Sequence, residues 1–367
     1  MADKTGIEWT DSSWNPIVGC SIVSAGCTNC YAMQFANRLL DKPDSHYHGT
    51  TRVVNNNAVW TGKVALAHDD ILTQPLQWKR PRKIFVNSMG DLFHESVPDA
   101  WIDQVFAVMA LAPQHTFQIL TKRSKRMRDY CNGSVRKGLI VDNEAISSFA
   151  PRRYEDRKAW PYPLPNVWLG VSVENQDHAD ARIPDLLQTP AAVRFLSCEP
   201  LLGAVDLNRV TLSHEPKHYI NCLDGWMSKS LGGGHFEHAP TDTDVIDWVI
   251  AGGESGKGAR PMHPDWIRNL RDDCIAAGTP FFFKQWGEYA PMFPHYPEEY
   301  GLEDEYQEVN LGFPKEGIMY RDGYFYNGIE HQAHVNSGAF WIERIGKKKA
   351  GRLLDGVAWN QFPKGGA

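Results

Sequence analysis

The chain has 367 residues, of which 42% are hydrophobic and 22% are charged, so it is expected to form one large globular domain or two. Disordered, collagen-like and coiled-coil classes are excluded by this composition. A formal net charge of −6 excludes a globally basic nucleic-acid-binding protein but leaves room for a local basic groove. Because no long apolar run and no secretion-signal pattern is present, we expect a cytoplasmic protein without membrane contact.

The N-terminal segment is predicted to supply the first unit of a repeating fold. Residues 7–19, IEWTDSSWNPIVG, are expected to lead as a strand into a loop that carries three cysteines. Residues 31–40, YAMQFANRLL, have the composition of the helix that follows this loop.

From residue 80 onward, short apolar runs alternate with amphipathic stretches, which predicts repeated strand–helix units around a parallel sheet. Residues 99–113 and 264–278 space their apolar side chains at helical intervals, and the second helix is expected to open at Pro264 and close at Gly278. The predicted strands are 83–88, 116–121, 166–173, 193–198, 247–253 and 280–286.

The fold class predicted from this order is α/β, with a partial or complete parallel (β/α) barrel. A doubly wound open sheet is the alternative. Residues 1–290 are expected to form the barrel domain, with surface insertions near 132–162 and 208–244. Residues 291–367 are interpreted as a C-terminal appendage beside the mouth of the barrel.

Three of the seven cysteines, Cys20, Cys27 and Cys30, fall within eleven residues. An odd cysteine count without a secretion signal argues against a disulfide framework and favours metal or redox chemistry. Three thiolates can hold three irons of a 4Fe-4S cubane cluster and leave the fourth iron open to a ligand. A closed zinc site normally needs four protein ligands, and His46 or His48 would supply the fourth only if the chain folds back.

A three-cysteine loop after the first strand of a β/α barrel resembles the radical SAM superfamily. This resemblance implies a 4Fe-4S cluster, S-adenosylmethionine as cofactor and an external electron donor. Six residues separate Cys20 from Cys27, where the superfamily usually has three, and Asn29 replaces the aromatic residue often found before the last cysteine.

A second resemblance extends over most of the chain, to an uncharacterised three-cysteine (CX6CX2C) domain family common in phages and prophages. Members of that family are regarded as diverged radical SAM proteins, and some are encoded beside a three-Cys-motif partner protein. The short segment TKRSKRMRD also resembles, weakly, the spore photoproduct lyases. The motifs that carry the family resemblance are TGIEWTDSSWNPIVGC, GCTNCYA, VNSMGDLFH, ILTKRSKRM, WLGVSVEN, FLSCEPLLG, VIAGGESG, FFFKQWGE and GKKKAGRLLDG.

Polar and charged residues follow most of the predicted strands, at the ends that form the active face of parallel α/β folds. Asp91 follows the second strand, where radical SAM enzymes carry the group that accepts the methionine amine. The expected cofactor-binding residues are Asp91, Ser172, Glu174, Gly252 and Gly253, and the catalytic candidates are Lys122, Glu199 and Glu254. A paired-carboxylate hydrolase would use Glu174 and Glu199 and would need no cysteine cluster.

Two basic runs favour a phosphate-bearing substrate, a nucleotide, DNA or RNA, if they border the mouth. One is residues 79–83, KRPRK, and the other comprises Lys122, Arg123, Lys125, Arg126 and Arg128. The leading hypothesis is a radical-SAM-like enzyme that abstracts hydrogen from such a substrate. The alternative is a non-catalytic binding protein, associated with nucleic acid or with a phage, in which zinc or a cluster only staples a loop.

Overall fold

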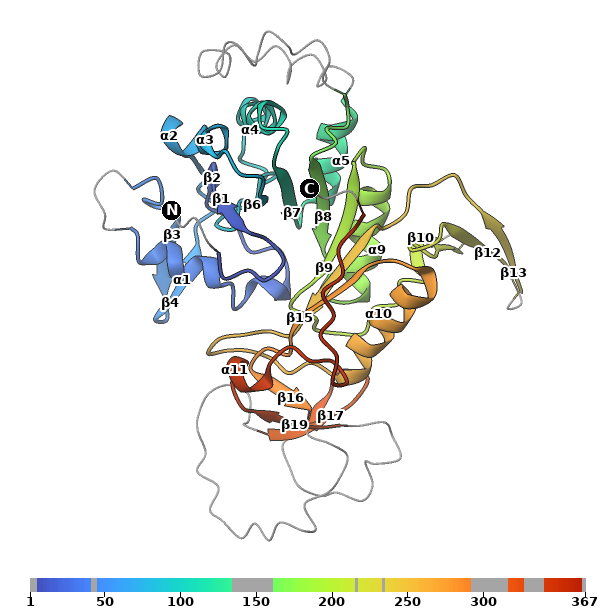
Figure 1. The fold of residues 1–367 in the computed structure, drawn as a ribbon. Coiled ribbons are helices and arrows are strands. Elements are labelled where there is room, and N and C mark those ends of the chain that lie inside the picture. Colours follow the sequence, from blue (N-terminus) through green and yellow to red (C-terminus); the bar gives the residue numbers. More distant parts are fainter. Residues whose placement is uncertain are drawn as a thin grey trace, which may run out of the picture.

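The computed structural model describes residues 5–40, 45–133, 161–214, 217–232, 235–291, 316–326 and 340–364 (Figure 1). Within these ranges, no helix is long and apolar enough to cross a membrane.

A seven-stranded parallel sheet forms the centre of the molecule and curls into a half-barrel. Across the sheet, the strands lie in the same order as along the chain, so the strand order never reverses. A doubly wound sheet has such a reversal, so that alternative is wrong. The predicted partial barrel is confirmed, since the two outermost strands do not pair with each other. The strands in order are β1 (Ser12–Trp14), β6 (Lys83–Val86), β7 (Thr116–Thr121), β8 (Val167–Ser172), β9 (Val193–Cys198), β14 (Trp248–Gly252) and β15 (Phe281–Gln285).

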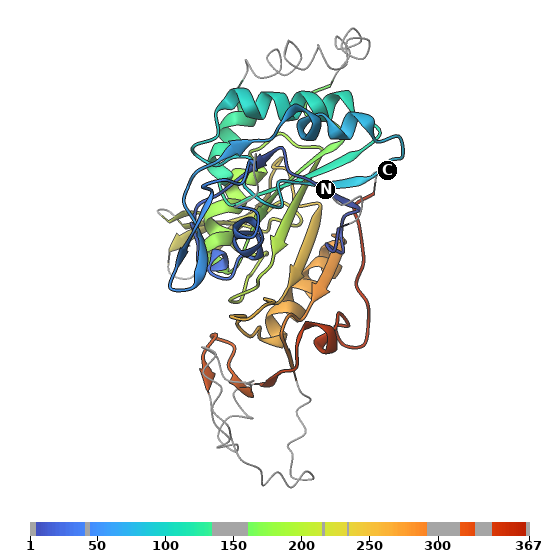
Figure 2. The ribbon, with the colours of Figure 1, turned by 90° about the vertical axis from the view of Figure 1, so that its left-hand side faces the viewer.

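The longer helices lie on the convex side of the curled sheet (Figures 1 and 2). Both helices predicted from periodicity are present, and the second begins with Pro264 and ends where Gly278 adopts a left-handed φ of 73°. The convex helices are α4 (Asp99–Leu111), α5 (Ser124–Asn132), α9 (Gln176–Leu187) and α10 (Pro264–Ala277).

Shorter elements surround the N-terminal part of the sheet and the cysteine loop. They are β2 (Ile17–Val18), the 3-10 helix η1 (Ala25–Cys27), α1 (Tyr31–Asn37), β3 (Thr51–Val54), β4 (Asn57–Trp60), β5 (Ala65–Leu66), α2 (Asp69–Leu72) and α3 (Gln74–Gln77). The helix predicted for residues 31–40 is therefore present as α1 and ends at Asn37.

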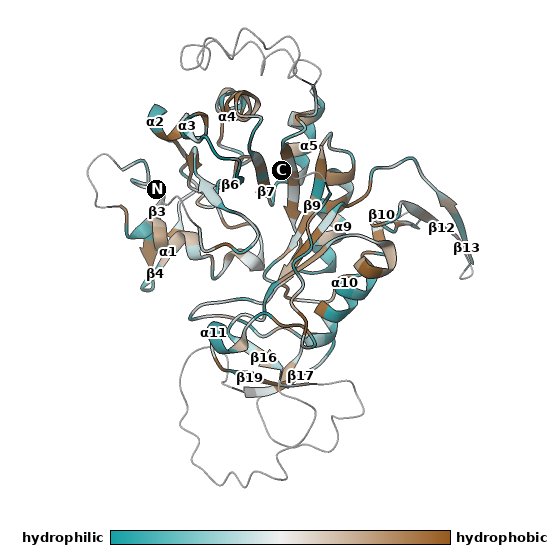
Figure 3. Cartoon of the chain, viewed as in Figure 1, coloured by the Kyte–Doolittle hydropathy of each residue, from teal (hydrophilic) through white to brown (hydrophobic). Residues whose placement is uncertain are grey.

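The two faces of the sheet bury different side chains. On the convex face, aliphatic side chains pack against the helices in the main hydrophobic core, and Figure 3 shows hydrophobic residues concentrated on the central strands. The concave face buries a separate cluster that is largely aromatic and includes Phe85, Trp168, Phe195, Trp248 and Phe282. Since successive side chains of a strand point to opposite faces, these rings face into the half-barrel, while Phe281 and Phe283 of β15 belong to the main core.

Along the concave face, polarity rises from the amino ends of the strands to their carboxyl ends. Strand β9 shows the gradient, with Phe195 in the buried cluster and Ser197 and then Glu199 in register above it on the same face. Strand β15 repeats it with Phe282 and Lys284. The polar cavity described below therefore lies above an aromatic layer.

The segment that joins β9 to β14 is an antiparallel sheet in place of a helix. Val210 of one edge strand and Ile220 of the strand beside it are buried in the main core, whereas every residue of the opposite edge strand is exposed. Its strands are β10 (Val210–His214), β11 (Lys217–Ile220), β12 (Trp226–Gly232) and β13 (His235–Pro240). They account for the insertion predicted near 208–244, and most of the other predicted insertion, residues 134–160, lies outside the described residues.

The C-terminal region contains a small antiparallel sheet and a segment that returns to the half-barrel. Arg344 of the small sheet donates hydrogen bonds to the carbonyls of Gly256 and Lys257, which places this sheet beside the mouth. The elements are β16 (Tyr289–Pro291), β17 (Glu316–Met319), β18 (Phe325–Tyr326), β19 (Phe340–Arg344) and α11 (Lys347–Ala350).

The final described residues cover the edge strand β15 rather than the mouth. The amide of Phe283 donates to the carbonyl of Trp359 (3.0 Å), and the amide of Gln361 donates to the carbonyl of Phe281 (3.2 Å). Figure 2 shows this red segment running beside β15. The ring of Phe362 then packs against Trp248 inside the half-barrel.

Candidate functional site

A cavity of about 270 Å³ opens at the carboxyl ends of the strands and is roofed by the cysteine loop. Its floor includes Trp9, Phe85 and Leu120 from the aromatic layer. The predicted residues that line it are Cys20, Cys27, Cys30, Asp91, Lys122, Ser172, Glu199, Gly253 and Glu254. Most of the residues predicted at the carboxyl ends of the strands therefore line one cavity. The predicted residues Glu174 and Gly252 do not line it.

The three thiols at this cavity are free. Cys27 is buried, and Cys20 and Cys30 are half-buried on either side of it. Burial, aided by the nearby Asp91 carboxylate, raises the pKa of the Cys20 thiol to about 12, although Arg123 acts in the opposite direction. Thiols with raised pKa values stay protonated and neutral until a metal displaces the proton.

The thiols do not close around a single metal ion. Zn–S bonds of about 2.3 Å require the sulfurs of a zinc site to gather closely, and the described part of the chain contains no such group of three Cys, His, Asp or Glu ligands. His46 stacks on Tyr47, and neither His46 nor His48 lines the cavity. A cubane cluster binds each thiolate to a different iron rather than to one shared ion.

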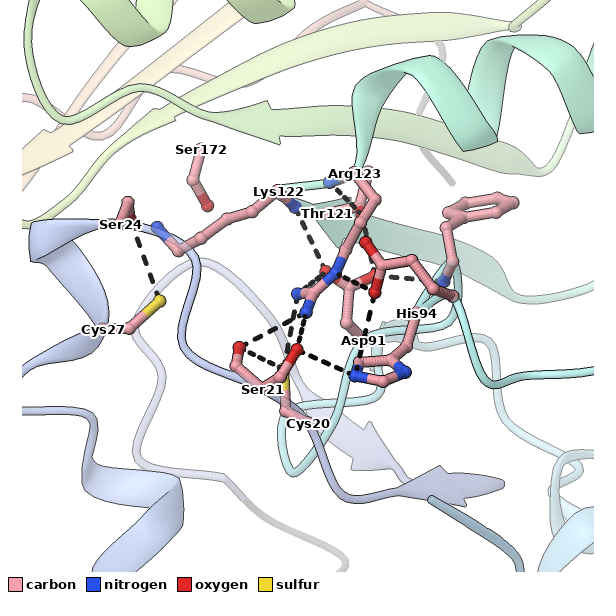
Figure 4. Close-up of polar contacts among 12 residues, drawn as sticks. Cys20, Ser21, Ser24, Cys27, Asp91, His94, Thr121, Lys122, Arg123 and Ser172 are labelled. Carbon is pink, nitrogen blue, oxygen red and sulfur yellow. Dashed lines mark hydrogen bonds and ion pairs between the residues drawn. The ribbon is translucent and has the colours of Figure 1, made fainter. Parts of the chain in front are cut away.

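Arg123, the residue before α5, forms hydrogen bonds to Cys20 and Ser21 at the start of the cysteine loop (Figure 4). Its Nη1 donates to Sγ of Cys20 (3.4 Å) and to Asp91 (3.0 Å), while its Nη2 donates to Oγ of Ser21 (2.8 Å). The other side of Ser21 meets Nε2 of His94 (2.9 Å). The start of the cysteine loop is thereby bonded to the ends of β6 and β7.

Asp91 is fully engaged by protein groups. Its Oδ1 accepts hydrogen bonds from the hydroxyl of Thr121 (2.7 Å) and the amide of Phe93 (3.0 Å), and its Oδ2 accepts from the amide of Lys122 (3.2 Å) and from Arg123. The carboxylate lines the cavity, yet its bonds give it a structural role in addition to any contact with a ligand.

Glu174 holds the middle of the cysteine loop from behind the cavity wall. Its side chain is 0% exposed and accepts hydrogen bonds from Ser24 (2.7 Å), Lys122 and Arg182 (2.7 Å). Burial alone would raise the pKa of this carboxyl, but the charges of Lys122 and Arg182 lower it to about 2. A Cβ added at Gly26 would lie 2.5 Å from Oε1 of Glu174, so loop and carboxylate are in direct contact.

The loop after β14 holds the far side of the cysteine loop. Arg260 forms a two-pronged ion pair with Glu254 (2.6 and 2.8 Å) and also donates to the carbonyl of Ala25 (3.0 Å). The side chain of Asn29 donates to the carbonyl of Gly258 (2.6 Å). Asn29 therefore fastens the loop to the half-barrel.

The predicted catalytic residue Glu199 pairs with Lys284 on the wall formed by β9 and β15. Nζ of Lys284 lies 2.8 and 2.9 Å from the two carboxylate oxygens, and Gln285 donates a further hydrogen bond (3.1 Å). Both members of the pair line the cavity, so together they offer a ligand one cationic donor and one anionic acceptor.

At the end of β14, the neighbouring backbone requires a glycine at Gly253 and leaves little room for a side chain at Gly252. A Cβ at Gly253 would lie 1.9 Å from the carbonyl oxygen of Trp286, and one at Gly252 would lie 3.0 Å from that of Gln285. The backbone of β15 therefore explains both glycines without a ligand, although Gly253 still lines the cavity.

The basic runs are divided between the two ends of the half-barrel. Lys83 begins β6 and lies at the amino ends of the strands, away from the mouth. On α5, Lys125 pairs with Asp129 (3.1 Å) and Arg126 pairs with Asp99 (3.0 Å), so these cations already have carboxylate partners.

Comparison with protein families gives one match, to the family model described as protein of unknown function (DUF5131), over residues 4–363. The chain belongs to this family. No curated protein and no solved structure matches it. The matched range contains every residue of the cavity, so the whole site is part of the DUF5131 domain.

Several residues of this DUF5131 site were not predicted from the sequence. Trp9, Phe85 and Ser197 line the cavity, and Ser21 and Arg260 hold the cysteine loop. The position of Ser197 could have been found, because it lies two residues before Glu199 in a predicted strand and so shares its face. The position of Arg260 could not be found in this way, because it belongs to an irregular loop without the two-residue repeat of a strand.

Proposed function

We propose that this DUF5131 protein is a radical-SAM-like enzyme that holds a 4Fe-4S cluster on Cys20, Cys27 and Cys30. The observation that carries the proposal is that all three thiols are free and line one cavity at the carboxyl ends of a parallel half-barrel. Three thiolates leave one iron of a cubane for a ligand from the cavity. When bound, the cluster supplies the electron, received from an external donor, that cleaves S-adenosylmethionine and generates the radical that abstracts hydrogen from the substrate.

The chain's own residues would position the reactants and exclude water. The apolar floor of Trp9, Phe85 and Leu120 closes the cavity from below, so a reactive intermediate is shielded on that side. Hydroxyl groups of Ser172 and Ser197 line the wall and can bond to polar atoms such as ribose hydroxyls.

The Glu199–Lys284 pair is proposed to contact the substrate. The pair lies in the same cavity as the cysteines. Glu199 follows β9 and Lys284 is on β15, so both come from strands far from β1 in the order of the sheet. Paired donor and acceptor groups suit the edge of a nucleobase or the hydroxyls of a sugar, which supports a nucleotide or nucleic acid as substrate.

Anaerobic reconstitution tests this function. Wild-type protein should take up iron and sulfide, turn brown, bind S-adenosylmethionine, and release 5′-deoxyadenosine when dithionite is added. Cys27→Ala should lose the cluster, whereas Cys131→Ala, which removes a buried thiol of α5 outside the cavity, should retain it. Tight zinc binding without affinity for S-adenosylmethionine would instead support the non-catalytic binding protein.

A further inference from the structure

Among the three cysteines of the cavity, Cys20 has a distinct environment. Its sulfur accepts a hydrogen bond from the guanidinium of Arg123, a permanently charged donor. Cys27 meets the neutral hydroxyl of Ser24 (3.8 Å). Burial raises the pKa of the Cys30 thiol, against the backbone amides of Ala32 and Met33 and the charge of Lys122, which lower it. Within the described residues, Cys20 is thus the one thiol of the cavity with a cationic hydrogen-bond donor.

Arg123 is held in place by bonds that fix the direction of its guanidinium. The side chain is 5% exposed, and its nitrogens also contact Asp91, Glu95 and both the carbonyl and hydroxyl of Ser21. Figure 4 shows the guanidinium between Asp91 on one side and the Cys20–Ser21 segment on the other. A planar fork bonded on several sides loses little further freedom when it binds a sulfur.

We propose that Arg123 is a positioning residue that holds Cys20 in place for the cluster and raises the reduction potential of that cluster through its hydrogen bond to the Cys20 sulfur. This inference rests on the proposed function, because it concerns the cluster that the three thiols would hold. Hydrogen bonds to cluster sulfurs and the charge near the cluster are the means by which a protein sets the reduction potential. A cation close to one thiolate stabilises the reduced cluster, which carries one more negative charge.

Asp91 supplies a second test with the opposite sign. Its carboxylate lies beside the same guanidinium and partly cancels its charge. Replacing Asp91 by Asn removes that negative charge while leaving Arg123 available to Cys20. The reduction potential should therefore rise in Asp91→Asn and fall in Arg123→Gln.

The experiment is a redox titration of the reconstituted cluster, followed by EPR in the absence of S-adenosylmethionine. Arg123→Gln should lower the ratio of reduced to oxidised cluster at least tenfold at a fixed potential, a shift of about 59 mV for one electron. Arg123→Lys keeps the positive charge but not the planar guanidinium, so its reduction potential should lie between those of Arg123→Gln and wild type. Arg128→Gln, on the helix that follows Arg123 but bonded to Asp129 and Asp185, should match the wild-type potential.

Each outcome has a defined meaning. If Arg123→Gln is folded but takes up no cluster while Arg123→Lys does, a charged side chain is needed to hold Cys20, which supports the positioning role. If Arg123→Gln takes up a full cluster with the wild-type potential, the inference is wrong and the proposed function stands. If wild-type protein takes up no cluster at all, the proposed function itself fails.

Discussion

The carboxylates that follow the strands of the half-barrel each have a cationic partner. Asp91 pairs with Arg123, Glu199 with Lys284 and Glu254 with Arg260, and Glu174 has both Lys122 and Arg182. Such pairs keep charged groups in a partly buried site without leaving any charge uncompensated. Four of these five cations donate to the cysteine loop or to Glu174, the carboxylate that holds the loop. Charge pairs thus tie the loop to the half-barrel, while Cys20 and Cys30 pack against a small apolar cluster that includes residues of α1.

Glu174→Gln is expected to lower the free energy of unfolding by about 3–5 kcal/mol, because it leaves Lys122 and Arg182 without their buried partner. The difference from wild type should depend on pH. The folded pKa of about 2 lies below the unfolded value of about 4.3, so the carboxylate stabilises the fold above that unfolded value. As pH falls from about 5 to 2, this contribution is lost.

Urea unfolding of wild type and Glu174→Gln at several pH values measures this effect. Glu95→Gln, which changes a side chain that is 64% exposed, serves as the control and should differ little from wild type. A constant difference between wild type and Glu174→Gln from pH 7 to pH 3 would contradict the assignment.

Gly26→Ala is expected to displace the cysteine loop without unfolding the protein. The added methyl group would meet Glu174 at 2.5 Å, and overpacking of this kind costs about 1–3 kcal/mol. Iron uptake per chain should therefore fall, while the far-UV circular dichroism spectrum stays that of wild type. Gly6→Ala is the matched control, because a Cβ at Gly6 meets nothing within 4 Å. Unchanged iron uptake in Gly26→Ala would show that the loop tolerates the shift.

At the scale of elements, apolar runs predicted the strands of the sheet closely. Strands β7 and β9 have the predicted bounds, 116–121 and 193–198. A strand buried on both faces is nearly all apolar, so it stands out in the sequence. The sheet that replaces a helix between β9 and β14 was predicted only as an insertion, because β13 is fully exposed and no residue of β12 is buried, so neither strand forms a clear apolar run.

The ion pairs of the site could not be predicted from the sequence in the same way. The sequence placed Asp91, Lys122 and Glu199 at strand ends, since this follows from where the apolar runs stop. It did not show which cation each carboxylate would meet, because the partner can come from a neighbouring strand, as with Glu199 and Lys284, or from a loop, as with Glu254 and Arg260.

The pairing of residues 359–361 with β15 closes one edge of the sheet, and Phe362 closes the aromatic layer beneath it. Phe362→Ala should lower the free energy of unfolding by about 1–2 kcal/mol, as expected for a half-buried aromatic ring. Leu353→Ala, at a residue that is 55% exposed, should change it much less. Urea unfolding measures both, and equal effects would show that the ring contributes no specific packing.

At the scale of the whole molecule, the two large apolar clusters of the half-barrel contain none of the three cavity cysteines. The fold should therefore persist without a metal. A variant with Cys20, Cys27 and Cys30 all replaced by Ala is expected to keep the urea midpoint of metal-free wild type and to bind no cluster. A collapse of its cooperative unfolding transition would support the alternative in which the metal staples the fold.

The gradient from aromatic to charged side chains along the concave face depends on a repeat of two residues. Deleting a single residue at the start of β9, before Phe195, would turn Phe195 and Glu199 toward the helices and bring Leu196 and Cys198 inward. The loops between strands carry no such constraint, and the segment between β9 and β14 already departs from the helical pattern. Natural length variation in this family should accordingly be confined to the connections, with strand lengths preserved.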